Sequence, residues 1–77
     1  SIALTAREFD VLLFLAEHPR QVFTADQLLE RFWSDIGDRH TVTVHIGRIR
    51  DKIERDPRQP RYLTTIWGVG YRFEGLL

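Results

Sequence analysis

Side chains that donate hydrogen bonds and carry positive charge are concentrated between Arg39 and Glu54. They are His40, His45, Arg48, Arg50 and Lys52. Guanidinium and ammonium groups are donors without acceptor capacity, and a protonated imidazole donates from both nitrogens. The chemistry that such a group supports is the binding of anions, with arginine able to form two parallel hydrogen bonds to one partner.

The same segment has the period of an amphipathic helix. Its buried stripe has spacings of four, three and four residues and consists of Val42, Ile46, Ile49 and Ile53. The opposite side carries His40, Val44, Gly47, Arg48, Asp51 and Arg55, with Thr41, Arg50 and Lys52 on its flanks. A solvated helix face rarely combines cations with an apolar Val44 and with Gly47, which costs about 1 kcal/mol against alanine. This face fits a partner that is negatively charged and partly apolar, as the major groove of DNA is.

Composition narrows the class of protein. The 77 residues, 43% of them hydrophobic, predict one small globular domain. The net charge is zero, yet residues 1–38 hold three cations and seven anions while residues 39–72 hold eight cations and three anions. This asymmetry indicates one phosphate-binding face, with chance segregation of surface charge as the alternative. The absence of cysteine excludes disulfides and thiolate zinc sites and fits the cytoplasm. The longest apolar run, residues 11–16, is too short to span a membrane.

Other chemistries lack the residues that they require. His40 and His45 are five residues apart, which is poor spacing for two metal ligands on a helix. Gly68 and Gly70 resemble half of a phosphate loop, but no strand–loop–helix unit surrounds them, so they indicate a hairpin. The chain has no nucleophile elbow, zinc-protease motif or apolar-walled carboxylate pair. We therefore expect no enzymatic activity, no metal and no cofactor.

Capping boxes mark two helix starts. Thr5 with Glu8 predicts a helix over residues 6–17, and Thr24 with Gln27 predicts one over residues 25–32. In the first helix we expect Phe9, Leu12, Leu13 and Ala16 to face the core, with Val11, Phe14 and Leu15 widening the apolar band. Residues 33–38 are predicted to form a loop. A third helix follows and ends near residue 55, with either Asp38 or Thr41 as its N-cap.

After the third helix the sequence changes to strand character. Residues 62–66 and 71–73 are rich in β-branched and aromatic types and flank a glycine-bearing turn, which predicts a β-hairpin. Three helices followed by a basic hairpin predict an α+β winged helix-turn-helix with a C-terminal β-hairpin wing.

The chain resembles the C-terminal effector domain of OmpR/PhoB-type response regulators. The matching motifs are Leu4-Thr5-x-x-Glu8-Phe9, Thr41-Val42-x-Val44-His45-Ile46-x-Arg48-Ile49-Arg50 and Thr65-Ile66-Trp67-Gly68-Val69-Gly70-Tyr71-Arg72-Phe73. The resemblance implies sequence-specific binding of double-stranded DNA, at tandem repeat sites, to control transcription in the bacterial cytoplasm. It also implies an upstream receiver domain and a sensor histidine kinase as partners in the full-length protein.

The resemblance assigns roles to individual residues. It implies that Arg48 reads a guanine, that Val44 packs on thymine methyls, and that the wing approaches the minor groove. It also implies that the loop Trp33–Asp38 contacts the DNA backbone or RNA polymerase. Phosphate contacts fall on Thr41, His45, Arg50 and Tyr71. The full predicted DNA-binding set is Trp33, His40, Thr41, Val44, His45, Arg48, Arg50, Lys52, Thr65, Trp67, Tyr71 and Arg72.

The sequence departs from the family at several positions. Gly47, His40 and Trp67 stand where many relatives carry basic residues, and the indole of Trp67 cannot compete for a narrow groove as an arginine does. The family's N-terminal sheet is reduced to residues 1–4 at most. We therefore expect one domain over residues 1–77, truncated at its N-terminus and without a receiver domain, with apolar surface bared on the first helix that promotes self-association.

Alternatives remain for several of these residues. Arg48 can be a surface arginine paired with Asp51, Val44 an ordinary exposed valine, His45 a structural histidine beside the core, and Trp67 a packed hairpin residue. The rival function is a winged-helix module that binds other proteins, with its basic hairpin docking RNA polymerase or a receiver domain.

Overall fold

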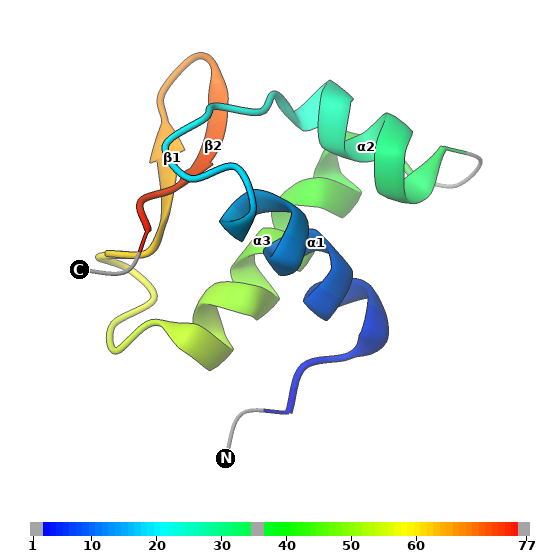
Figure 1. Ribbon diagram of the computed structural model, residues 1–77. Coiled ribbons are helices and arrows are strands. Elements are labelled where there is room, and N and C mark those ends of the chain that lie inside the picture. The colour runs from blue at the N-terminus through cyan, green and yellow to red at the C-terminus, as the bar shows by residue number, and fades with distance from the viewer. Residues whose placement is uncertain (1–2, 35–36, 76–77) are drawn as a thin grey trace.

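The computed structural model describes residues 3–34 and 37–75, which form three helices followed by a β-hairpin (Figure 1). The elements are α1 (Ala6–Ala16), α2 (Ala25–Trp33), α3 (Arg39–Ile53), β1 (Leu63–Ile66) and β2 (Gly70–Phe73). The hairpin stands at one side of the helices, next to the segment that joins α1 and α2. The predicted winged helix-turn-helix is confirmed. No helix among the described residues is both long and apolar enough to span a membrane.

All three helices begin with a capping box. In α1 the Thr5 hydroxyl accepts from the Glu8 amide at 3.2 Å, and the Glu8 carboxylate accepts from the Thr5 amide at 2.9 Å. The predicted box of Thr24 and Gln27 is also present. At α3 the two candidate caps act together, because Asp38 is the N-cap and Thr41 is its capping-box partner.

The core lies between the three helices and the inner face of the hairpin. Its members are Val11, Leu15, Phe23, Leu28, Trp33, Val42, Ile46, Ile49, Leu63 and Phe73. The stripe predicted on α3 is confirmed, since its first three members are at most 1% exposed and Ile53 packs against the core.

The inward face predicted for α1 is right for Leu12 and Ala16, which pack against the core, and wrong for Phe9 and Leu13. Val11 and Leu15 are completely buried, whereas Phe9 and Leu13 are 53% and 44% exposed. The apolar band of α1 is too broad for periodicity alone to orient it. Glu8 lies on the same buried side as Val11 and Leu15, and its carboxylate is paired there with Lys52 of α3.

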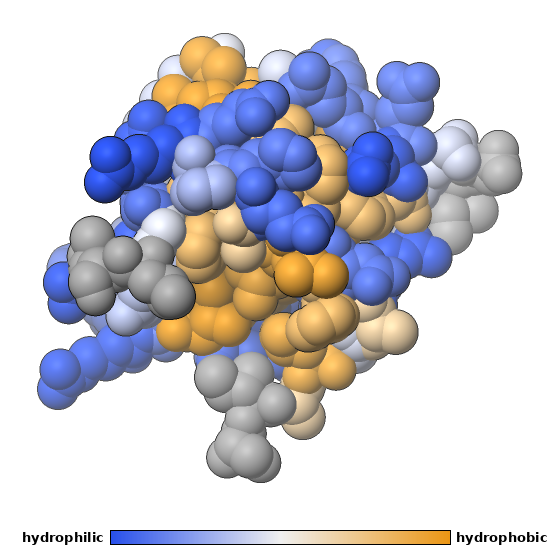
Figure 2. All heavy atoms as spheres, viewed as in Figure 1, coloured by the Kyte–Doolittle hydropathy of each residue, from blue (hydrophilic) through white to orange (hydrophobic). Residues whose placement is uncertain are grey.

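An apolar surface covers part of the outside of α1. Figure 2 shows hydrophobic side chains gathered over the front of the molecule, where α1 lies in Figure 1. A groove there is lined by Leu4, Phe9, Leu12 and Ile53 among others. Exposed apolar surface on the first helix is therefore confirmed for the described residues, and self-association through it stays a prediction.

The hairpin is joined to the segment before α2 by a β-bridge. Phe23 and Tyr71 exchange both backbone hydrogen bonds at 2.9 Å. Gly70 permits this approach, because a Cβ atom there would lie 2.0 Å from the Phe23 carbonyl oxygen. This pairing joins residues 48 positions apart, and no local pattern in the sequence predicts it.

Candidate nucleic-acid interface

One side of α3 faces solvent along the length of the helix. The exposed residues on it are His40, Thr43, Arg48 and Asp51, and Val44 and Gly47 are half-buried. Arg55, which was predicted on this face, lies beyond the end of the helix. A Cβ atom at Gly47 would meet no atom within 4 Å, so the space above the helix backbone is open. The predicted orientation of this face is confirmed. Thr43 also belongs to it, and the sequence analysis missed this threonine although the helical period places it beside His40 and Gly47.

Arg48 is the cation at the centre of this face. Within residues 3–34 and 37–75, no ion pair or hydrogen bond joins its guanidinium to another residue, so the structure does not show the alternative pairing with Asp51. Its five donors are therefore available to a partner outside the described chain.

The wing-facing side of α3 is bonded to the hairpin. Arg50 donates from Nε to the Leu63 carbonyl and from Nη2 to the Thr65 hydroxyl, each at 2.8 Å. Its guanidinium carbon lies 5.8 Å from the centre of the Tyr71 ring. Burial lowers the pKa of Arg50 from its usual value. This arginine thus links the helix to β1.

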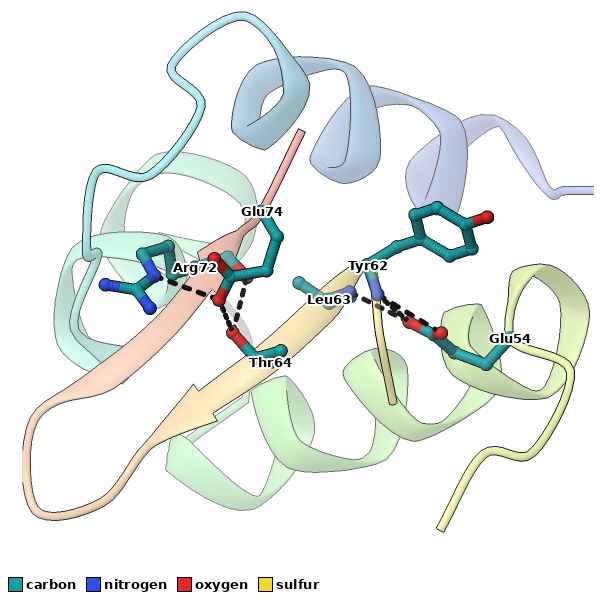
Figure 3. A network of polar contacts seen from close by, with 6 residues as sticks. All are labelled: Glu54, Tyr62, Leu63, Thr64, Arg72 and Glu74. Atoms are coloured by element: carbon teal, nitrogen blue, oxygen red, sulfur yellow. Dashed lines mark hydrogen bonds and ion pairs between the residues drawn. The ribbon is translucent and has the colours of Figure 1, made fainter. Parts of the chain in front are cut away.

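Glu54 forms a second link at the end of α3. Its carboxylate, in a residue only 7% exposed, accepts hydrogen bonds of 2.8–3.2 Å from the backbone amides of Arg61, Tyr62 and Leu63. Figure 3 shows the bonds from Tyr62 and Leu63. Three amides that would otherwise lack partners are satisfied by one side chain. The carboxylate therefore fixes where β1 begins relative to the helix.

Arg72 lies on the other face of the hairpin from this junction. Its register partner is Thr64, whereas Thr65 and Tyr71 pair with each other, and successive strand residues point to opposite faces. The Arg72 Nε donates to Glu74 at 3.0 Å, and the Thr64 hydroxyl donates to the same carboxylate (Figure 3). Hydrogen bonds from Thr64 and then Arg72 lower the pKa of Glu74. Arg72 therefore lies on the opposite face of the hairpin from Tyr71, and its predicted DNA contact stays a prediction.

Trp33 is also placed differently from the prediction. It is the last residue of α2 rather than part of a loop, and it is 4% exposed. Its ring centre lies 4.8 Å from that of His45, whose Nδ1 is 2.8 Å from the Thr41 carbonyl oxygen. A DNA contact by Trp33 is wrong because helix packing buries the indole. These contacts agree with the structural alternative for His45. Residues 35 and 36 of the predicted contact loop lie outside the described residues.

Lys52 points toward α1 and not toward the open face. Its ammonium group forms an ion pair with Glu8, whose side chain is only 3% exposed. The hydrogen bond from Lys52, together with that from the Thr5 amide, lowers the pKa of Glu8. In the structure this amine neutralises a buried carboxylate, and the predicted DNA contact of Lys52 stays a prediction.

The tip of the hairpin is apolar and exposed. Trp67 is 89% exposed and Val69 is 53% exposed, so the alternative in which Trp67 packs within the hairpin is wrong. Gly68 supplies the positive φ of 77° that the turn needs, and the Val69 amide closes the turn on the Ile66 carbonyl at 2.9 Å. The described residues contain no group of three or more histidine, aspartate or glutamate side chains arranged to hold a metal ion.

Comparison with known proteins identifies the family. The family described as "Transcriptional regulatory protein, C terminal" matches residues 1–73. The structure superimposes on response regulator DrrB of Thermotoga maritima, described as an OmpR/PhoB homolog, with a TM-score of 0.91 and 53% identity over 96% of this chain and 34% of DrrB. The chain belongs to the C-terminal domain family of OmpR/PhoB-type regulators.

Other members of the OmpR/PhoB family are also similar. The DNA-binding response regulator MtrA of Mycobacterium tuberculosis is 49% identical over 73 residues, which cover 92% of this chain and 32% of MtrA. The DNA-binding domain of response regulator AdeR, solved in complex with an intercistronic region, matches with a TM-score of 0.81 and 29% identity over 95% of this chain and 74% of the AdeR chain. The chain spans about a third of the length of the curated relatives that it matches.

Proposed function

We propose that this OmpR/PhoB-type domain binds double-stranded DNA sequence-specifically as the output module of a two-component response regulator that controls transcription. The observation that carries the proposal is the open face of α3, where Arg48 is exposed and Gly47 leaves room for close approach. The names of relatives such as MtrA, which include DNA binding, support the same function.

The proposed binding mode follows from the placement of α3 and the wing. The exposed face of α3 enters the major groove, with Arg48 donating two hydrogen bonds to guanine O6 and N7 and Val44 packing on a thymine methyl. Phosphate contacts come from groups at the edges of that face, among them His40, Thr41 and Tyr71. The hairpin stands beside α3 because Arg50 and Glu54 hold it there, and it reaches the neighbouring minor groove.

The partners proposed for the full-length protein follow from the family. Two copies bind tandem repeats, a receiver domain phosphorylated by a sensor histidine kinase controls the output, and RNA polymerase is reached through the segment that joins α2 to α3. This assembly acts in the bacterial cytoplasm, where the chromosome is accessible.

The experiment is a salt titration. A fluorescent duplex of random sequence is titrated with this chain at several salt concentrations, and the logarithm of the binding constant is plotted against that of the salt concentration. Each neutralised phosphate contributes a slope of about −0.9, so three to five contacts predict a slope of roughly −2.7 to −4.5. The absence of affinity for any duplex, combined with binding to RNA polymerase or a receiver domain, would favour the rival interaction module.

A further inference from the structure

An exposed ion pair joins the start of α2 to the start of α3. The Arg39 Nε donates to Asp26 Oδ1 at 2.8 Å, and the Arg39 Nη2 donates to Asp26 Oδ2 at 2.7 Å. The arginine and aspartate side chains are 74% and 60% exposed, so burial does not require either charge to be neutralised. An ion pair so open to water contributes little to folding. Its main consequence is that it limits what else Arg39 can bind.

The pair has the geometry with which arginine binds a phosphate. Two parallel N–H donors of one guanidinium meet two oxygens of one anion, an arrangement that arginine forms with carboxylates and phosphates alike. The carboxylate of Asp26 therefore occupies two donors that a phosphate would use. The hydrogen bond from Arg39 lowers the pKa of Asp26, so the carboxylate is ionised at neutral pH and keeps its hold on the guanidinium.

Arg39 lies at the edge of the surface proposed to meet DNA. It is one helical turn before Thr43, whose hydroxyl donates to the Arg39 carbonyl at 3.2 Å and lies 3.5 Å from the Tyr71 hydroxyl. Tyr71 is among the groups proposed above to contact a phosphate. A DNA strand at Tyr71 therefore runs within about one helical turn of Arg39, and its phosphates compete with Asp26 for the same guanidinium.

Asp26 also has a favourable place in α2, because it is the acidic residue of the first turn and interacts with the helix dipole. The start of α2 does not depend on this charge alone. Thr24 and Gln27 form a capping box with hydrogen bonds of 2.8 Å and 3.0 Å. The helix therefore keeps its N-terminal hydrogen bonds when the Asp26 charge is removed.

We propose that Asp26 is an intramolecular competitor of DNA, because its carboxylate holds Arg39 in place of a phosphate and thereby weakens duplex binding. This inference rests on the proposed DNA-binding function and concerns how its strength is set. The pair adds no net charge to the interface, and removal of the carboxylate releases one cation. Since phosphate contacts carry no sequence information, Asp26 lowers the part of the affinity that is independent of base sequence.

A double-mutant cycle in salt titrations tests the competition on a fluorescent duplex of random sequence. Asp26→Asn should tighten binding about threefold to tenfold at about 0.1 M salt and steepen the salt slope by about one unit, because Arg39 then neutralises a phosphate. Arg39→Gln alone should leave the slope unchanged, because Asp26 already occupies that guanidinium. The same change made in the Asp26→Asn chain should remove the unit that was gained.

Glu30→Gln is the matched control. Glu30 is an exposed carboxylate one turn after Asp26 on α2, and it forms no ion pair within residues 3–34 and 37–75. This variant should stay within about twofold of wild type and keep its slope, because a lone exposed charge is screened by salt. Arg39→Gln leaves α2 untouched, so its slope tests the proposal even if Asp26→Asn were to lose its fold.

Two results would overturn the competition while leaving DNA binding intact. Equal gains for Asp26→Asn and Glu30→Gln would show that general loss of negative charge accounts for the effect. An Arg39→Gln change that flattens the slope by one unit in both backgrounds would show that Arg39 contacts DNA despite Asp26. A wild-type chain without duplex affinity would instead overturn the proposed function and this inference with it.

Discussion

Arg48 and Arg50 lie two residues apart on α3 and have opposite surroundings. Arg48 is exposed on the open face, whereas Arg50 is half-buried and donates to the Leu63 carbonyl and the Thr65 hydroxyl of β1. The two sides of one helix therefore have different roles. The open side is available to a binding partner, and the wing-facing side holds the hairpin in place.

This difference shows that charge alone does not identify a binding residue. Both arginines are predicted DNA contacts because the family resemblance assigns a guanine to Arg48 and a phosphate to Arg50. The structure separates them, because two of the Arg50 donors are already used within the protein. Arg50 lies 200° around the helix from Arg48 and therefore has different neighbours. Those neighbours determine what each arginine can bind.

The largest effect is expected from the wing-facing junction. Glu54→Ala leaves three amides without their acceptor and should lower the free energy of unfolding by about 3 kcal/mol, measured by urea denaturation. Glu54→Gln keeps one acceptor oxygen and should lose less. Asp51→Ala, an exposed change on the open side, is the control and should stay within about 0.5 kcal/mol. Equal stability of Glu54→Ala and Asp51→Ala would contradict the proposed junction.

A smaller loss is expected when Arg50 itself is removed. Arg50→Ala should lower the free energy of unfolding by about 1–2 kcal/mol, because hydrogen bonds from a charged donor to Leu63 and Thr65 are lost. The matched variant Arg48→Ala should leave stability nearly unchanged in the same denaturation experiment. If both variants were equally stable, the contrast between the two sides of α3 would be wrong.

The third contrast is between α3 and α1 and concerns pH. The pKa of Glu8 in the folded protein lies below its ordinary value of 4.5, mainly because Lys52 donates to it. The carboxylate therefore stabilises the fold above about pH 4.5, and this contribution is lost as the pH falls through the lowered pKa. Thermal melts between pH 6 and pH 3 should show a smaller acid-induced loss in Glu8→Gln than in wild type. Lys52→Gln should also reduce the loss, and identical pH profiles for all three proteins would refute the pairing.

The elements were predictable because their signals are local. A capping box needs only residues three positions apart, so Thr5 with Glu8 and Thr24 with Gln27 mark helix starts from sequence alone. The stripe on α3 was predictable for the same reason, because it is narrow and has one period.

The errors concern contacts between distant segments. The burial of Trp33 depends on α3 packing over the end of α2, and the pairing of Lys52 joins positions 44 residues apart. The inward face of α1 was predicted only in part, since a broad apolar band does not specify an orientation. The exposed face of α3 was predicted correctly because it lies opposite the narrow buried stripe of the same helix.

The most direct test of the account compares Arg48→Ala with wild type on a randomised duplex library. If the open face of α3 reads DNA, the variant should bind the selected site more weakly by about 1–3 kcal/mol and should lose preference at one base pair while keeping the others. If wild type and Arg48→Ala rank the library sequences identically, α3 does not read bases through Arg48, and the central claim is contradicted.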